Sequence, residues 1–518
     1  MNAQQLRDLE KNLWDTADNL RANSSLTAAE YKDPLLGLIL LRFAQNRFEE
    51  VKLQIENNLP INPRTSKARE VTKEDFIGAG ALFLQDKSKY EYLANLPESE
   101  DISEAVNNAM RLLEADYTDL SGILPKNYQE LENDLLRELI RAFNSEAISS
   151  ITGDAFGRIY EYFLMKLSMI GAGAQEGGEF FTPPSLVDLI VNFIEPDHGI
   201  IHDPACGSGG MFVQTGYFIK DHTNKSINEA ITVYGTEHKN NTSKLAKMNL
   251  AIHGIEGKII EGNSYYSDPH SLIGKCDFVM ANPPFNTKGI DKDRDFVKED
   301  PRLPFGTPNN NNGNYMWIQY FHSFLNENGR AGFVMASSAT DAGSSEKLIR
   351  QQLIETGDVE AIVSVGNNFF YTRSLPCHLW FLNKNKQDKD SIMMIDARNT
   401  FRKVNTTLHD FSPDQLEGLT TIIKSYRGEN VDFAANEWLT STFESGNYED
   451  VEGLCKVASK EDIIENDYSL TPGRYVGFSI QNDEEFDYQG RMSEIHNELA
   501  KLNSDSDELM QSIQGLKL

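Results

Sequence analysis

Apolar residues recur at intervals of three and four in the first 150 positions of this chain, which has 518 residues. This spacing indicates amphipathic helices. It is clearest at residues 6–20, 34–43 and 131–140, where acidic and polar residues fill the other positions. We therefore expect residues 1–150 to form a helical N-terminal domain.

Between residues 151 and 400, short apolar runs alternate with helical stretches, so the pattern changes to one typical of an α/β fold. Helices are expected at 154–163, from 211 and around 346–350. The runs expected to form buried strands are 200–202, 231–235, 258–260, 278–280, 331–335, 361–365 and 379–382. Residues 401–480 show no clear motif and are expected to form a mixed C-terminal extension.

Beyond residue 488 the spacing becomes helical again, and apolar side chains fall on the a and d positions of a heptad with Ser506 as the polar interruption. The residues on this seam are Met492, Ile495, Leu499, Leu502, Leu509, Ile513 and Leu516. Residues 481–518 could form an amphipathic helix packed on its own domain. A seam at a chain end more naturally predicts a helix that docks on another subunit.

The residues 282–285, Asn-Pro-Pro-Phe, follow the apolar run 278–280 and would lie at the carboxyl end of its strand. Two prolines hold the backbone in a rigid extended turn. The side-chain oxygen of Asn282 and the carbonyl of Pro283 then form two fixed acceptors, with the Phe285 ring beside them. This set fits a flat heterocycle that carries an amino group. The alternative is an ordinary Asn-Pro turn.

Such acceptors have a chemical use, because an exocyclic amine is a poor nucleophile while its lone pair is delocalised into the ring. Accepting both amine hydrogens frees the lone pair for attack. The acceptors act most strongly in the transition state, where the amine becomes positive. No metal is required if the methyl donor is already an activated sulfonium.

A glycine-rich turn follows the strand expected at 200–202 and has the sequence DPACGSGG, from Asp203 to Gly210. It differs from the dinucleotide motif G-x-G-x-x-G because Phe212 stands in the place of the third glycine, and it is no phosphate loop. The next strand ends at Glu237, where a carboxylate could bind the ribose hydroxyls of an adenosine. A purely structural turn is the alternative.

Thr182 precedes two prolines and could cap the helix that begins near Pro183 or Pro184, which would leave first-turn N–H groups for a carboxylate. A capped helix without a ligand is the alternative.

Residues 286–313 lack periodicity and contain several lysines and arginines, Arg302 among them. We expect them to form a structureless loop beside the pocket for the amino-bearing heterocycle, and a long loop of this kind is usually functional or mobile.

The turn at 203–209 together with Asn282–Phe285 resembles the S-adenosylmethionine motif and the catalytic motif of amino-methyltransferases. Residues 178–184, GEFFTPP, resemble the segment before the cofactor motif in the modification subunit of type I restriction–modification systems. The resemblance runs over most of the chain, through 329–334 and 367–370. Cys206 and Ser208 stand at positions that vary in the family, and Glu179 stands where a glutamine is also found.

The resemblance implies a Rossmann-like, S-adenosylmethionine-dependent methyltransferase sheet between residues 151 and 400, and N6-adenine methylation of DNA. It places Asn263 near the adenine amine of the cofactor, although a structural turn there is nearly as plausible. The expected catalytic residues are Asn282, Pro283, Pro284 and Phe285. The expected cofactor-binding residues are Glu179, Phe180, Phe181, Thr182, Pro183, Pro184, Asp203, Gly207, Ser208, Gly209, Gly210, Glu237 and Asn263.

Other functions stay open at this point. A cytosine-N4 methyltransferase would use the same geometry, but Asn rather than Ser at position 282 favours adenine. A methyltransferase that acts on protein glutamine or on RNA could also carry Asn-Pro-Pro, and it would not obviously need the helical N-terminus. A scaffold without activity is disfavoured by the intact Asn282, Phe285 and Asp203.

Composition bears on location and partners. The chain has no apolar run of membrane-spanning length and no export signal, and its four cysteines lack metal or disulfide spacing, so we expect a cytoplasmic protein without a bound metal. The formal net charge of -29 opposes DNA binding by the chain alone. A separate specificity subunit is expected to choose the target, with two modification subunits for each specificity subunit and a restriction/translocase subunit in the full complex.

Overall fold

The computed structural model describes residues 3–24, 26–58, 71–79, 81–117, 120–149, 151, 153–169, 182–309, 311–370, 374–405 and 408–477. It forms two units, Met1–Val476 and Gly477–Leu518. In the second unit the described positions 492, 496, 499, 500, 502, 503 and 506 are helical. Ile495, Leu509, Ile513 and Leu516 of the expected heptad seam lie outside the described residues.

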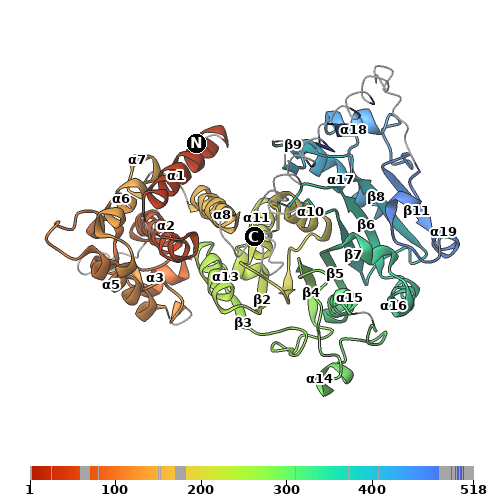
Figure 1. The fold of residues 1–518 in the computed structure, drawn as a ribbon, viewed down its shortest axis with the longest axis horizontal. Coiled ribbons are helices and arrows are strands. Elements are labelled where there is room, and N and C mark those ends of the chain that lie inside the picture. Colours follow the sequence, from red (N-terminus) through yellow and green to blue (C-terminus); the bar gives the residue numbers. More distant parts are fainter. Residues whose placement is uncertain are drawn as a thin grey trace, which may run out of the picture. The chain divides into compact units, whose positions relative to one another are not determined.

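The N-terminal region is helical, as its periodicity predicted (Figure 1). Its buried side chains form one core, which also takes in Leu245, Met248 and Ile252 of a helix in the α/β region, α13 (Asn240–Ile252). None of the helices in the described ranges is long and apolar enough to cross a membrane. The helices are α1 (Ala3–Ala22), α2 (Ala28–Asn58), α3 (Lys73–Gly78), α4 (Tyr90–Ala94), α5 (Ile102–Asp116), α6 (Asn133–Phe143), α7 (Glu146–Ser149) and α8 (Gly153–Met169).

A nine-stranded sheet forms the centre of the α/β region, which confirms the predicted fold class (Figure 1). Its order is β11-β8-β6-β7-β5-β4-β1-β2-β3. Neighbouring strands among β1 to β5 are parallel, and β7 runs antiparallel to both β5 and β6. The strands are β1 (Gly199–Asp203), β2 (Ile231–Glu237), β3 (Gly257–Glu261), β4 (Cys276–Ala281), β5 (Leu325–Ala336), β6 (Val359–Val365), β7 (Cys377–Asn383), β8 (Ser391–Ala397) and β11 (Cys455–Ser459).

Each face of this sheet is covered by helices, so most strand residues are buried on both sides, as in parallel sheets generally. The core of one face includes side chains of α10 (Pro184–Ile194), α11 (Gly210–His222) and α17 (Pro413–Tyr426). The core of the other includes side chains of α15 (Asn314–Phe324) and α16 (Ser344–Glu355). Shorter elements are α12 (Ile227–Ala230), α14 (Asp295–Lys298), α18 (Glu437–Thr442), α19 (Lys460–Glu465) and the hairpin of β9 (Arg402–Lys403) and β10 (His409–Asp410).

The strand order reverses between β1 and β4, because β2 follows β1 on one side and β4 and β5 lie on the other. In open α/β sheets a crevice forms at this point, outside the carboxyl ends of the strands. The sequence after β1 and the sequence after β4 therefore meet at one place. These are the two motifs that the sequence singled out.

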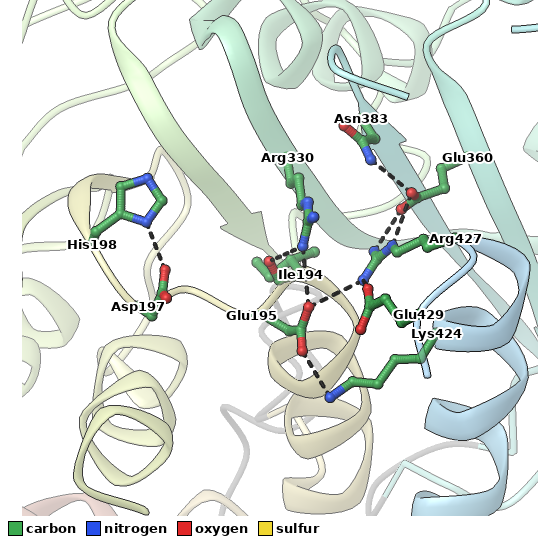
Figure 2. Close-up of polar contacts among 10 residues, drawn as sticks. All are labelled: Ile194, Glu195, Asp197, His198, Arg330, Glu360, Asn383, Lys424, Arg427 and Glu429. Atoms are coloured by element: carbon green, nitrogen blue, oxygen red, sulfur yellow. Dashed lines mark hydrogen bonds and ion pairs between the residues drawn. The ribbon is translucent and has the colours of Figure 1, made fainter. Parts of the chain in front are cut away.

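The amino edge of the sheet is the side at which the parallel strands begin, opposite this crevice. Ion pairs join charged side chains there (Figure 2). Glu195 follows α10 and accepts hydrogen bonds from Arg330 at 3.2 Å and from Arg427 at 3.4 Å, while its other oxygen lies 2.8 Å from Lys424. Arg427 also pairs with Glu360, the second residue of β6, at 2.7 Å. The network connects α10, α17 and the central strands.

Candidate functional site

The glycine-rich turn between β1 and α11 has open space beside its backbone. Gly207 has φ +54° and Gly209 has φ +80°, conformations that favour glycine. A Cβ atom placed on Gly207 or on Gly210 would meet no atom within 4 Å. The backbone at these two positions therefore faces open space, and a ligand can approach it closely.

Glu237 lies beside this turn, at the end of β2, as the parallel register of β1 and β2 requires. Its carboxylate accepts hydrogen bonds from the backbone N–H of Gly207 at 3.1 Å and of Lys239 at 2.8 Å. The N–H of Gly207 thus donates to the protein's own Glu237. Glu237 lies at the end of its strand, as the sequence predicts, and these two bonds hold its carboxylate in place.

Asp203 ends β1 and is almost completely buried. Its carboxylate accepts from the backbone N–H of Ala205 at 2.9 Å. Burial, to which the negative charge of Glu237 adds, raises the pKa of the Asp203 carboxyl well above its ordinary value. A positively charged ligand at this turn would favour the charged form of the Asp203 carboxyl.

Asn263 begins the turn after β3. Its side-chain oxygen accepts from the backbone N–H of Tyr265 at 3.0 Å, so it stabilises the turn itself. The next residue, Ser264, donates its hydroxyl to the carbonyl of Pro204 at 2.6 Å. This bond fixes the Asn263 turn against the glycine-rich segment, two parts of the chain that are 60 residues apart.

Asn282 follows the buried residue Ala281 at the carboxyl end of β4. Strands β1 and β4 pair directly, Ile201 with Phe278, so the two motifs lie at the same end of neighbouring strands. The half-buried Phe285 lies with its ring at 83° to that of Phe370, with ring centroids 6.4 Å apart.

The residue after the motif, Asn286, adopts φ +53° and is held by Asn314. The side-chain oxygen of Asn314 accepts from the backbone N–H of Asn286 at 2.8 Å, and its amide nitrogen donates to the side-chain oxygen of Asn286 at 2.9 Å. The sequence did not point to this pair, because the two residues lie 28 positions apart and no local pattern connects them. It fixes the chain at its exit from the motif.

The prediction that Thr182 caps a helix is wrong. Helix α10 begins at Pro184 with Pro183 as its N-cap residue and without a side-chain cap, because Thr182 lies one position too early. The hydroxyl oxygen of Thr182 instead accepts a hydrogen bond from the side-chain amide nitrogen of Asn282 at 3.0 Å. The segment before α10 and the motif after β4 are therefore in direct contact.

The described residues of the expected loop, 286–309 and 311–313, have one regular element, α14, and are held by contacts with the rest of the protein. Arg302 is buried and pairs with the equally buried Asp300 at 2.7 Å. Its guanidinium also donates to the carbonyl of Ser264 at 3.0 Å and lies over the ring of Tyr320 at 4.1 Å. Arg302 thus joins this segment to the turn that carries Asn263.

Two other positive side chains of this segment also have partners within it. Lys292 donates to the carbonyls of Pro308 at 2.7 Å and Asn312 at 3.2 Å. Arg294 lies 3.3 Å from Asp291 and over the ring of Tyr266 at 4.1 Å. These contacts, together with those of Arg302, hold the segment beside the motif in place.

Three expected cofactor residues, Glu179, Phe180 and Phe181, lie outside the described residues. Ser208 is described, and its carbonyl accepts from the side chain of Asn249 at 3.0 Å. Within the described ranges, no group of three or more histidine, cysteine or acidic side chains is arranged to hold a metal ion. The four cysteines are buried and unpaired, and burial raises the pKa of the Cys206 thiol well above its ordinary value.

The fold and the paired motifs define an α/β protein of the methyltransferase type. A family model described as N-6 DNA Methylase matches residues 151–484, and one described as the HsdM N-terminal domain matches residues 9–143. The chain belongs to the N-6 DNA methylase family.

Relatives and solved structures narrow this placement to one branch of the family. The chain is 35% identical to the methylase subunit of the type I restriction enzyme MjaIX from Methanocaldococcus jannaschii, over 98% of this chain and 91% of that protein. It is 33% identical to the methylase subunit of HindI from Haemophilus influenzae, over 80% of this chain and 92% of that protein. The methyltransferase subunit of a type I restriction–modification system from Streptococcus thermophilus shares the fold, with a TM-score of 0.72 and 20% identity over 91% of this chain and 99% of that one.

Proposed function

We propose that this chain is the modification subunit of a type I restriction–modification enzyme and methylates the N6 amine of adenine in DNA. Membership of the N-6 DNA methylase family and the relationship to type I methylase subunits support this function. The observation that carries it is the position of Asn282–Phe285. The motif follows β4 at the strand-order reversal, next to the glycine-rich turn after β1.

Asn282 and Pro283 supply the chemistry on the DNA side. Their oxygens accept the two hydrogens of the adenine amine, and this stabilises the positive charge that develops on nitrogen during attack. Phe285 offers a ring face to the extruded base. The perpendicular ring of Phe370 limits the movement of Phe285.

The cofactor of this reaction is S-adenosylmethionine, which when bound supplies a methyl group on a positively charged sulfonium. The open space at Gly207 and Gly210 fits a ligand held against the backbone, and the carboxyls of Asp203 and Glu237 favour its charge. We assign the ribose to Glu237 and the adenine to the turn of Asn263. Residues 179–184 are assigned to its methionine end.

DNA recognition requires a partner, because a chain of net charge -29 has little electrostatic attraction for a phosphate backbone. We propose a specificity subunit that brings the positive surface and selects the sequence, shared by two modification subunits. A restriction/translocase subunit would complete the enzyme. The scattered cysteines suit the reducing cytoplasm in which we place this complex.

The segment proposed to dock on the specificity subunit is 481–518, on the strength of its heptad seam. A chain that lacks residues 488–518 should keep its fold and its cofactor affinity and should no longer co-purify with the specificity subunit. Retention of the truncated chain in the complex would place the docking surface elsewhere.

The function itself is tested with the complex of this chain and a specificity subunit. Duplex DNA that contains the target is incubated with S-adenosylmethionine, digested to nucleosides and analysed by mass spectrometry. N6-methyladenine should form, and an Asn282→Ala complex should form it about 100- to 1,000-fold more slowly. N4-methylcytosine instead would contradict the assignment. Methylation of one defined sequence by the chain alone would contradict the need for a specificity subunit.

A further inference from the structure

The hydrogen bond between Thr182 and Asn282 joins residues that are 100 positions apart in sequence. The amide nitrogen of Asn282 donates and the hydroxyl oxygen of Thr182 accepts, over 3.0 Å. A side-chain amide has a donor end and an acceptor end of nearly equal size. Contact with a hydrogen-bond acceptor at one end therefore decides where the other end points.

Both partners of this bond stand on rigid backbone. Asn282 comes directly after a buried strand and before two prolines. Thr182 comes directly before Pro183 and Pro184, and the carbonyl of Pro183 accepts from the first turn of α10, from Leu186 at 3.0 Å. Because proline fixes φ and restricts the residue before it, the main freedom left to Asn282 is rotation of its amide.

That rotation matters for the reaction. With its oxygen toward the base, the amide accepts a hydrogen of the target amine. With its nitrogen toward the base, two donors would face each other and the amine would lose an acceptor. A group that prevents this rotation raises the rate of methyl transfer without contact with the DNA base or the sulfonium.

We propose that Thr182 is a positioning residue that holds the Asn282 amide with its oxygen toward the target amine. This inference rests on the proposed function, since it needs an amine that Asn282 serves. It gives Thr182 a role on the DNA side of the reaction, in addition to its place in a segment assigned to the cofactor. Thr182 acts through Asn282 and transfers no proton itself.

The test compares Thr182→Val, which keeps the shape of the side chain and loses the acceptor, with Thr182→Ser, which keeps it. Each variant is purified in complex with the specificity subunit. Calorimetry gives the Kd for S-adenosylmethionine, and tritium transfer at saturating cofactor gives kcat. A matched control is Thr223→Val at the end of α11, where the hydroxyl donates to the carbonyl of Ile219 at 2.8 Å and accepts from the N–H of Lys225 at 3.2 Å.

In the Thr182→Val complex we expect kcat to fall by roughly tenfold, the effect of one lost hydrogen bond in the transition state. The cofactor Kd and the melting temperature should match those of the wild type. Thr182→Ser should restore most of kcat, and Thr223→Val should leave it unchanged.

Several results would overturn the inference. If Thr182→Val weakens cofactor binding while kcat at saturation is unchanged, Thr182 serves the cofactor. If Val and Ser both lower the melting temperature and kcat together, the role is structural. Full activity of Thr182→Val would also exclude a positioning role. A wild-type complex that methylates no adenine would contradict the proposed function instead, so the two failures are distinguishable.

Discussion

The two edges of the central sheet are built in different ways. At the amino edge, Glu195, Arg330, Arg427 and Glu360 are joined by ion pairs (Figure 2). At the carboxyl edge, glycines with positive φ and a pair of prolines shape the backbone, and Asn282 and Phe285 are half-buried. The amino edge is built for stability and the carboxyl edge for binding, so substitutions at the two edges should have separable effects.

The largest effect is expected from Arg427→Met at the amino edge. The side chains of Arg427 and Glu360 are 7% and 2% exposed, so the substitution leaves a buried carboxylate without its partner. We expect the free energy of unfolding to fall by ~3–5 kcal/mol, measured by urea unfolding. Cofactor affinity of the folded chain should be unchanged.

Arg402→Met is the matched control for this variant. Arg402 pairs with Asp410 on an exposed hairpin, with side chains 53% and 27% exposed. Its loss should cost less than ~1 kcal/mol. Equal losses in the two variants would show that the network of Figure 2 stabilises no more than a surface pair does.

A fall in pH should also distinguish the wild type from Arg427→Met, because it changes the charge of Glu360. Burial disfavours the charged form of Glu360, but Arg427 and Asn383 more than offset it, so the pKa of Glu360 is lowered. A lowered pKa contributes stability above the unfolded value of about 4.3 that is lost as pH falls through the folded pKa. In Arg427→Met the buried carboxyl loses this offset, and its pKa should rise.

The free energy of unfolding should therefore depend on pH differently in Arg427→Met and in the wild type. Between pH 7 and the unfolded pKa of about 4.3, the stability deficit of Arg427→Met relative to the wild type should shrink as pH falls, because protonation removes the unpaired charge. Urea midpoints measured for both proteins across this range test the sign. A constant or growing deficit would contradict the account of Glu360.

At the carboxyl edge the largest effect is expected from Asn282→Ala. Removal of an acceptor that acts in the transition state should lower kcat by about 100- to 1,000-fold. Cofactor affinity should stay nearly intact, because Asn282 acts on the amine and not on the sulfonium. Tritium transfer and calorimetric titration measure the two quantities, with Asn328→Ala, an exposed residue of β5, as control. Parallel loss of cofactor affinity would contradict the role of Asn282.

Much of this architecture could be predicted from the sequence, because short apolar runs that alternate with helical stretches are typical of an α/β fold. All seven expected strands are present, and the motifs lie where strand order reverses. β8 and β11 were missed, since neither SIMMIDA nor CKVAS alternates regularly or lies beside a motif.

Interactions between distant residues could not be predicted in the same way. Arg302 was grouped with the other lysines and arginines of the expected loop, because a sequence does not show that Asp300, Ser264 and Tyr320 surround it. Thr182 was assigned to a helix cap, because its neighbours suggested one and its true partner is 100 residues away. The roles of Glu237 and Asn263 toward a cofactor stay predictions.

A smaller effect is expected from Phe285→Ala. Extrusion of a paired adenine costs a few kcal/mol, and an aromatic face returns about 1–3 kcal/mol of it. The variant should lose more activity on paired DNA than on DNA with a mismatched target adenine, whose extrusion costs less. Steady-state rates on the two duplexes measure this difference. Equal losses would show that the ring only packs against Phe370.

The smallest effect is expected from alanine at single glycines, one near each edge of the sheet. Gly207 after β1 and Gly428 after α17 both have positive φ, +54° and +79°, and a Cβ on either would meet no atom within 4 Å. Alanine at either position therefore costs a similar ~1–2 kcal/mol of backbone strain. Only the methyl group at 207 would enter the space assigned to the cofactor. Calorimetry should show S-adenosylmethionine binding weakened by about tenfold, or ~1.4 kcal/mol, in Gly207→Ala and unchanged in Gly428→Ala. Similar Kd values for the two variants would place the cofactor away from this turn.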